Sequence, residues 1–154
     1  MQLAPIPWVS PVVYLLLFAI LWIGVIWLLS HLTGWVALAK IYRAPTAAAG
    51  IPVRLRSVHL GSGLLGQYRN VLTAWVSGEG LQLRMLFLFR VNTPDLFFPW
   101  SDVSVSRGRQ LFFDYVELKF RLTPDIPLRI YGKAAEQLRE VAAEHWPERM
   151  APAV

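Results

Sequence analysis

The pattern of apolar and polar positions divides the chain into two parts. Residues 12–32 are apolar without interruption except for Ser30 and His31. A helix of about 21 residues is roughly 31 Å long, which is enough to cross the hydrocarbon core of a bilayer. The pattern therefore predicts a transmembrane helix over residues 12–33, preceded by an N-terminal segment over residues 1–11.

Both ends of this run carry signals of a membrane helix. Ser10 and Pro11 suit the N-cap and the first helical position. Tryptophan and tyrosine are enriched where a membrane meets water. Such residues stand near both ends of the predicted span: Trp8, Tyr14, Trp35 and Tyr42.

Charge predicts the orientation of the helix. The first charged residue of the chain is Lys40, and Arg43 follows it, so no basic residue precedes the apolar run. The positive-inside rule then places the N-terminus in the periplasm or lumen and the rest of the chain on the cytoplasmic side of the membrane. A cleaved signal peptide is the alternative, and the alanine-rich residues 46–49 resemble a cleavage site. A signal peptide would have basic residues before a shorter apolar core, so a retained anchor is favoured.

Residues 34–52 are expected to form a short helix along the membrane interface, followed by a linker. In the helix, Trp35, Leu38 and Tyr42 share one face, and the basic Lys40 and Arg43 lie near the headgroups. The linker is rich in proline and alanine, which is typical of a connection between two structural units.

From Val53 onward the apolar residues alternate with a period of two, which is typical of β-strands. Turn-forming residues, including those at 107–110, divide this region into six or seven expected strands: 54–60, 67–77, 81–90, 97–100, 102–107, 111–122 and 126–131. The clearest inward faces are formed by Leu81, Leu83, Met85, Phe87 and Phe89 and by Val116, Leu118, Phe120 and Leu122.

Helical spacing returns only near the C-terminus, over residues 133–146. Apolar positions and His145 recur there at the intervals of one helix face, and Pro147 ends the pattern. The sequence therefore predicts a mainly-β domain over residues 53–154. Its six or seven antiparallel strands would form a rolled sheet or partly open barrel capped by a C-terminal helix.

This order of elements resembles a pleckstrin-homology-like (PH-like) domain. The resemblance is closest to small, largely uncharacterised bacterial membrane proteins that join one N-terminal helix to such a domain. It is carried by Gly34-Trp35 with residues 38–43, by Gly78-Glu79-Gly80-Leu81, and by residues 98–103 (Phe-Pro-Trp-Ser-Asp-Val). The resemblance implies seven strands in two near-orthogonal sheets, with the C-terminal helix closing one end.

Composition narrows the possible functions. The chain contains no cysteine, which excludes disulfides, thiol catalysis and thiolate metal sites. Its 15 Lys and Arg against 10 Asp and Glu give a net charge of +5, and all of them follow the apolar run. A basic domain next to a membrane attracts anionic headgroups or an acidic partner, whereas tethering argues against nucleic acid. Candidate contact residues are Arg54, Arg56, Arg84, Arg107 and Arg109.

No pattern predicts catalysis. The glycines of residues 61–66 (GSGLLG) match a dinucleotide fingerprint, but a strand-like run follows instead of the required helix, so a loop is predicted. His31 is a candidate axial ligand of a pigment or haem, because histidines within membranes often have functions. Asp114, expected to point inward, and His59 have no catalytic partner in sequence. We therefore expect no enzyme, no cofactor, no metal site and no small-molecule substrate.

Two tryptophans lie well inside the predicted span, which is unusual for a residue that prefers interfaces. Trp22 and Trp27, with the small Gly24 between them, favour packing against another helix. We therefore expect a non-catalytic accessory subunit of a larger membrane complex, such as a photosynthetic reaction-centre, light-harvesting or respiratory assembly. A membrane-tethered module that binds lipids or peptides is the alternative. Contacts at the membrane surface are expected from Trp35, Lys40, Tyr42 and Arg43.

Overall fold

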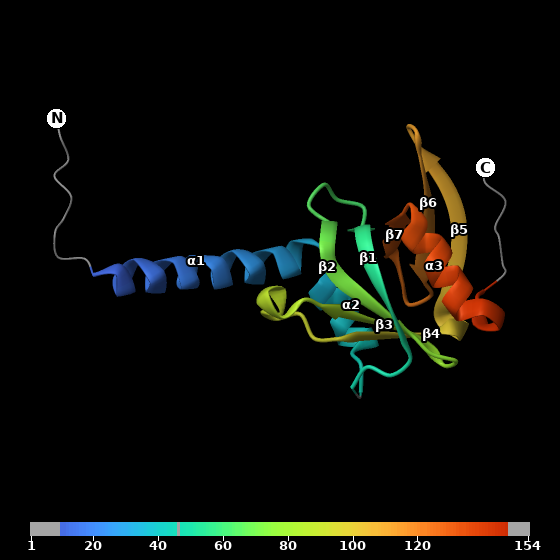
Figure 1. Ribbon diagram of the computed structural model, residues 1–154, viewed down its shortest axis with the longest axis horizontal. Coiled ribbons are helices and arrows are strands. Elements are labelled where there is room, and N and C mark those ends of the chain that lie inside the picture. The colour runs from blue at the N-terminus through green and yellow to red at the C-terminus, as the bar shows by residue number, and fades with distance from the viewer. Residues whose placement is uncertain (1–9, 46, 148–154) are drawn as a thin grey trace.

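The computed structural model describes residues 10–45 and 47–147, so Trp8, Thr46 and residues 148–154 lie outside the described part. A long helix, α1 (Pro11–Leu32), projects from a β-rich domain (Figure 1). It begins and ends within one residue of the predicted span, and Pro11 occupies its first turn, where a backbone donor is not needed. By length and composition, α1 is a candidate membrane span.

A second helix, α2 (Trp35–Tyr42), follows α1 after a turn at Gly34, whose φ is 85°. Its apolar face does not lie along a membrane surface as predicted. Trp35, Leu38 and Tyr42 are instead buried in the core of the β domain. The same spacing of apolar residues serves a helix on a bilayer and a helix on a protein core, so the pattern alone could not separate the two.

Seven antiparallel strands form one sheet, which confirms the expected strand content. They are β1 (Ile51–Leu60), β2 (Gln67–Val76), β3 (Gly80–Met85), β4 (Leu96–Pro99), β5 (Val103–Gln110), β6 (Phe113–Phe120) and β7 (Thr123–Tyr131). Their order is β4-β3-β2-β1-β7-β6-β5. β1 joins the two halves, because it pairs with β2 along most of its length and with β7 over Val58–Leu60.

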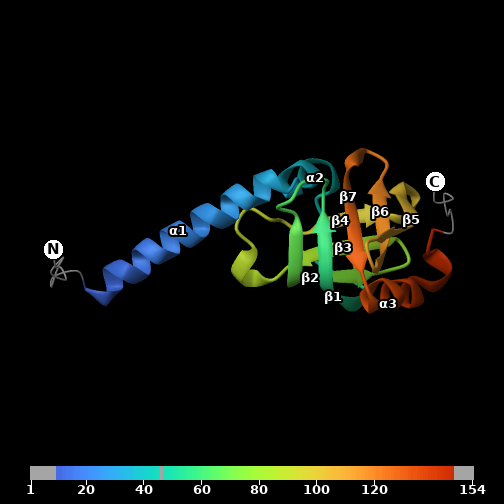
Figure 2. The same cartoon turned by 90° about the horizontal axis from the view of Figure 1, so that it is seen from above.

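The C-terminal helix, α3 (Lys133–Ala142), covers β1, β2 and β7. Figure 2 shows α2 and α3 on opposite sides of the strands. The helix is shorter than predicted because the backbone leaves helical geometry at Ala143, where φ is 41°. A 3-10 turn follows (Ala143–His145), so His145 is exposed, while Trp146 is buried close to Trp100.

Aromatic stacking joins the two halves of the sheet. Phe98 of β4 and Phe120 of β6 are both fully buried, and their ring centroids lie 3.8 Å apart. Tyr42 packs against both rings, with centroid distances of 4.8 Å and 5.9 Å. α2 is therefore part of the same core as the strands.

The predicted and observed ends of several strands differ. β3 stops at Met85 rather than at residue 90, because its pairing with β2 ends at Leu72 opposite Met85. The apolar alternation continues past that point, but Phe87 lies in an exposed 3-10 turn (Phe87–Phe89). β6 stops at Phe120, so Leu122 is exposed rather than inward. β5 runs straight through residues 107–110, and the turn follows it.

Candidate functional site

A groove of about 1030 Å³ lies where β1, β2 and β7 meet the start of α3 and the β5–β6 turn. Its lining contains no carboxylate. The groove is therefore a candidate site for an anionic ligand. Its five permanently charged residues, all basic, are Arg54, Arg56, Arg69, Arg129 and Lys133.

The strand pattern explains how β1 supplies two of these arginines. Val53 and Leu55 point into the core, so the alternation along β1 turns Arg54 away from it. The register with β2 shifts between Leu55 and Ser57, which leaves Arg56 at a bulge. Arg54 and Arg56 are two residues apart and therefore point to the same face of β1, opposite the buried Leu55, so both line the groove.

Most of the groove's charge is not neutralised by the domain itself. Among the described residues, Arg54, Arg56, Arg69 and Lys133 form no ion pair with a carboxylate. Four cations that share one groove repel one another, and an anion placed between them removes that repulsion. The groove is thus electrostatically prepared for a ligand of negative charge.

Arg129 has a different role, because it is already paired. Its Nε donates a hydrogen bond of 2.6 Å to the Glu117 carboxylate, and Lys119 Nζ lies 3.3 Å from the other oxygen. Burial raises the pKa of the Glu117 carboxyl, but the hydrogen bonds from Arg129 and Lys119 outweigh burial and hold that pKa below its ordinary value. Glu117 therefore stays ionised at neutral pH. Its carboxylate holds the Arg129 side chain in place on the lining of the groove.

Exposed apolar side chains border the basic residues. Leu64, at the tip of the β1–β2 loop, is 98% exposed and lines the groove together with Phe113. The neighbouring Phe112, in the β5–β6 turn, is 87% exposed. His59 also lines the groove, and its Nδ1 is buried without a hydrogen-bond partner in the described structure. The site therefore offers apolar contacts next to its charges.

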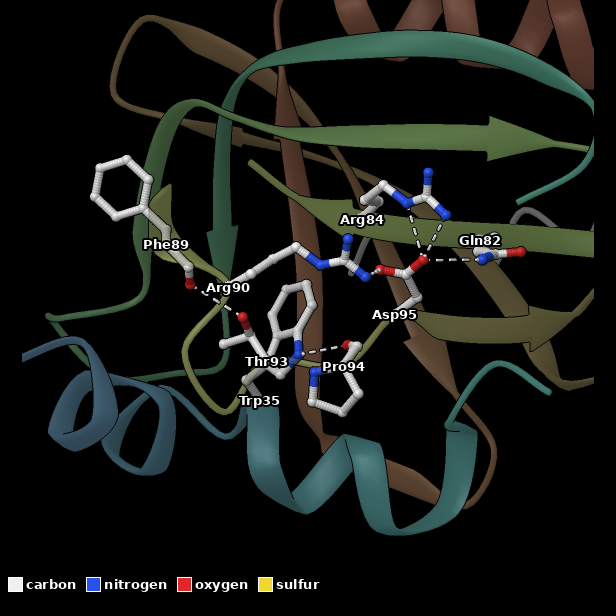
Figure 3. Close-up of polar contacts among 8 residues, drawn as sticks. All are labelled: Trp35, Gln82, Arg84, Phe89, Arg90, Thr93, Pro94 and Asp95. Atoms are coloured by element: carbon white, nitrogen blue, oxygen red, sulfur yellow. Dashed lines mark hydrogen bonds and ion pairs between the residues drawn. The ribbon is translucent and has the colours of Figure 1, made fainter. Parts of the chain in front are cut away.

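A second polar cluster holds the loop between β3 and β4 (Figure 3). The Asp95 carboxylate accepts hydrogen bonds from Arg84 Nε at 2.9 Å, from Arg90 at 3.1 Å and from Gln82 at 3.4 Å. Arg84, a predicted contact of headgroups or of an acidic partner, binds this carboxylate within the domain. The cluster is a structural clamp that fixes the loop on β3.

The predicted basic residues are only partly brought together. Arg54 and Arg56 share the groove, whereas Arg107 and Arg109 are exposed on β5. Arg109 pairs at 3.5 Å with Asp114, which is exposed and does not point inward as predicted, because the β5–β6 hairpin extends beyond the core. Prediction missed two groove residues whose place depends on strand pairing and on the start of α3: Arg69 and Lys133.

The predicted membrane residues are distributed along α1. Trp22 contacts the domain's own β3–β4 loop, whereas Trp27 packs against His31 in a tilted arrangement with ring centroids 4.4 Å apart. His31 Nδ1 lies 2.9 Å from the carbonyl oxygen of Trp27, which engages that nitrogen. A Cβ added at Gly24 would meet nothing within 4 Å, so one side of α1 remains open. In α2 and just after it, Lys40 and Arg43 are exposed.

The glycine-rich loop of residues 61–66 connects antiparallel β1 and β2, as predicted, and no helix follows it. Within residues 10–45 and 47–147, no three histidine, aspartate or glutamate side chains are grouped so that they could hold a metal ion. Comparison with known proteins finds no family model, no curated protein and no solved structure that matches the chain.

Proposed function

We propose that this chain is a non-catalytic accessory subunit of a larger membrane complex in a bacterial inner membrane. In this proposal α1 spans the bilayer with its N-terminus in the periplasm, and the groove binds an acidic segment of a neighbouring subunit. The observation that carries the proposal is the positive charge of Arg54, Arg56, Arg69 and Lys133 in one groove, which no carboxylate in the described part of the chain pairs. The apolar rim at Leu64 suits a segment that also contains apolar side chains.

The architecture supports the resemblance to a PH-like domain. Seven antiparallel strands in two halves, joined through β1 and followed by a C-terminal helix, have the element order that such a domain requires. Fold alone does not assign an activity. The proposal therefore depends on the groove and on the open side of α1 at Gly24 and Trp27, where a partner helix would pack.

Paired substitutions of equal charge test the groove. Arg54→Gln combined with Lys133→Gln removes two groove cations, and Arg107→Gln combined with Arg139→Gln removes two exposed cations outside it. Extracted in mild detergent, the wild-type chain and the control should migrate on native gels with a far larger species. The groove variant should shift toward the single chain. A wild-type chain that is always alone, or a groove variant that stays in the complex, would contradict the proposal.

A second candidate function is recognition of anionic lipid, because one wall of the groove adjoins the end of α1. The β1–β2 loop lies close to Thr33, the residue that directly follows α1. A side-chain Cβ placed on Gly61 of this loop would be 3.4 Å from the Thr33 carbonyl oxygen. Headgroups around α1 would then lie near that wall. In nanodiscs of mixed phosphatidylcholine and phosphatidylglycerol, native mass spectrometry should show phosphatidylglycerol enriched on the full chain and not on the groove variant.

A further inference from the structure

We infer that the loop between β3 and β4 is a second membrane-inserted element, whose apolar tip enters the hydrocarbon layer beside α1. The apolar tip consists of Leu86, Phe87, Leu88 and Phe89. Phe87 and Leu88 are 74% and 52% exposed, although the strand that precedes them is buried. The inference rests on one part of the proposed function, namely that α1 crosses a bilayer.

The apolar tip is attached to the middle of α1, not to its end. Trp22 Nε1 donates a hydrogen bond of 3.3 Å to the carbonyl oxygen of Leu88, and the rings of Trp22 and Phe89 lie 5.4 Å apart. Lower on the same loop, the Asn92 amide lies 3.4 Å from Ser30 Oγ. Figure 1 shows the 3-10 turn of this loop beside the half of α1 that is nearer the domain.

These contacts define one face of α1. Trp22, Ile26 and Ser30 are four residues apart and therefore lie above one another on the helix. Ile26 and Ser30 are the only buried residues of α1. Eight residues of helix correspond to about 12 Å, so the loop follows the span over about that length. Leu88 is hydrogen-bonded to Trp22, so it lies at the same depth as the middle of α1. Lipid that surrounds α1 at this depth would therefore also surround Leu88.

The backbone carbonyl groups of the apolar tip suit a lipid environment, in which polar groups need partners within the protein. The carbonyl oxygens of Leu86 and Phe87 accept hydrogen bonds from the amides of Phe89 and Arg90. The remaining two carbonyls accept from side chains, Leu88 from Trp22 and Phe89 from Thr93. All four carbonyl groups of the tip are therefore satisfied without water.

Basic residues lie at the base of the loop, where lipid phosphates would meet it. Arg84 and Arg90 share the Asp95 carboxylate (Figure 3). These three residues line a hollow in the surface, and Arg43 lines it too. Three arginines and one carboxylate give the base of the loop a net positive charge. Apolar side chains followed by basic ones match the change from hydrocarbon to anionic headgroups.

The absence of cysteine from the chain allows a clean test, since one introduced cysteine carries one spin label. We would place the label through Phe87→Cys, with Phe18→Cys in α1 and Phe112→Cys in the β5–β6 turn as references; all three side chains are exposed. The labelled full chains in nanodiscs are then exposed to oxygen, which concentrates in hydrocarbon, and to an aqueous nickel chelate. Circular dichroism confirms that each variant remains folded.

The label at position 87 should show an oxygen-to-chelate accessibility ratio close to that at position 18 and several-fold above that at position 112. If the label at position 87 is as accessible to the chelate as the label at position 112, the inference is overturned. The proposal that α1 spans the membrane would be unaffected by that result. Protection of position 87 from both reagents would also overturn the inference, because a protein partner would then cover the tip. An aqueous label at position 18 would instead refute the anchor itself.

Discussion

The hydroxyl group of Tyr42 donates a hydrogen bond of 3.2 Å to the carboxylate of Asp102, 60 residues further along the chain. The same hydroxyl oxygen accepts a hydrogen bond from the amide of Leu122, and the carboxylate is also bound by Arg121. Burial raises the pKa of Tyr42, so its hydroxyl remains a neutral donor at physiological pH. This network fastens the segment that leaves α1 to the turn between β6 and β7.

Removing this hydroxyl should destabilise the domain. The variant Tyr42→Phe leaves the buried Asp102 with one donor fewer and the Leu122 amide without its partner, which costs about 1–3 kcal/mol. Chemical denaturation of the full chain in detergent measures the loss. The matched control is Tyr131→Phe, which removes an exposed hydrogen bond from the Tyr131 hydroxyl to Gln110, and it should change stability little. Equal effects of the two variants would contradict the role of the Tyr42 network.

The burial of α2 predicts where the domain can be cut. A fragment that begins at residue 53 lacks Trp35, Leu38 and Tyr42, which fill the core. Each buried side chain contributes about 1.5–3 kcal/mol, and small domains have only about 5–15 kcal/mol in total. The fragment should therefore lack a cooperative thermal transition, whereas one that begins at residue 34 should show it. Cooperative unfolding of the shorter fragment would disprove the structural role of α2.

The Glu117–Arg129 pair predicts a dependence of stability on pH. The pKa of Glu117 is lowered by folding, so its stabilisation is complete above its ordinary value of 4.5 and is lost as the pH falls through the folded-state pKa. Glu117→Gln should therefore cost about 1 kcal/mol at pH 7, and the difference from wild type should shrink toward pH 3. Exposed Glu144→Gln is the control. A gap that is constant across this range would refute the assignment.

The clamp at Asp95 predicts a local effect. Asp95→Asn weakens the hydrogen bonds to Arg84 and Arg90, which should cost about 1–2 kcal/mol and loosen the β3–β4 loop. Hydrogen exchange of residues 86–93 should become faster, while the core amides of β1 and β7 should keep their relative protection. Asn at the exposed position Asp125 serves as the control. Unchanged exchange in the loop would show that other contacts hold it.

Much of this architecture follows from local pattern, because α1 and the strands each depend on residues close in sequence. The position of the apolar face of α2 does not follow from local pattern. Its residues Trp35, Leu38 and Tyr42 suit a bilayer surface and a protein core equally well. Phe87 continues the alternation of β3, and only the end of the pairing between Met85 and Leu72 of β2 shows that the strand has ended.

The groove was the least predictable feature. Arg54 and Arg56 could be selected from one strand, but Arg69 reaches the site through the pairing of β1 with β2. Lys133 reaches it only because α3 begins directly after β7. Sites assembled by pairing between distant segments leave no periodic signal in the sequence, and the three-dimensional register is needed to recognise them.

The burial of α2 also has a consequence for biosynthesis. A ribosome makes the chain from its N-terminus, so α2 emerges long before Phe98 and Phe120, the rings against which Tyr42 packs. Until those strands are translated, the apolar face of α2 has no protein core to cover. If α1 spans a bilayer, as proposed, that bilayer is the nearest apolar surface that can cover this face while the strands are being made.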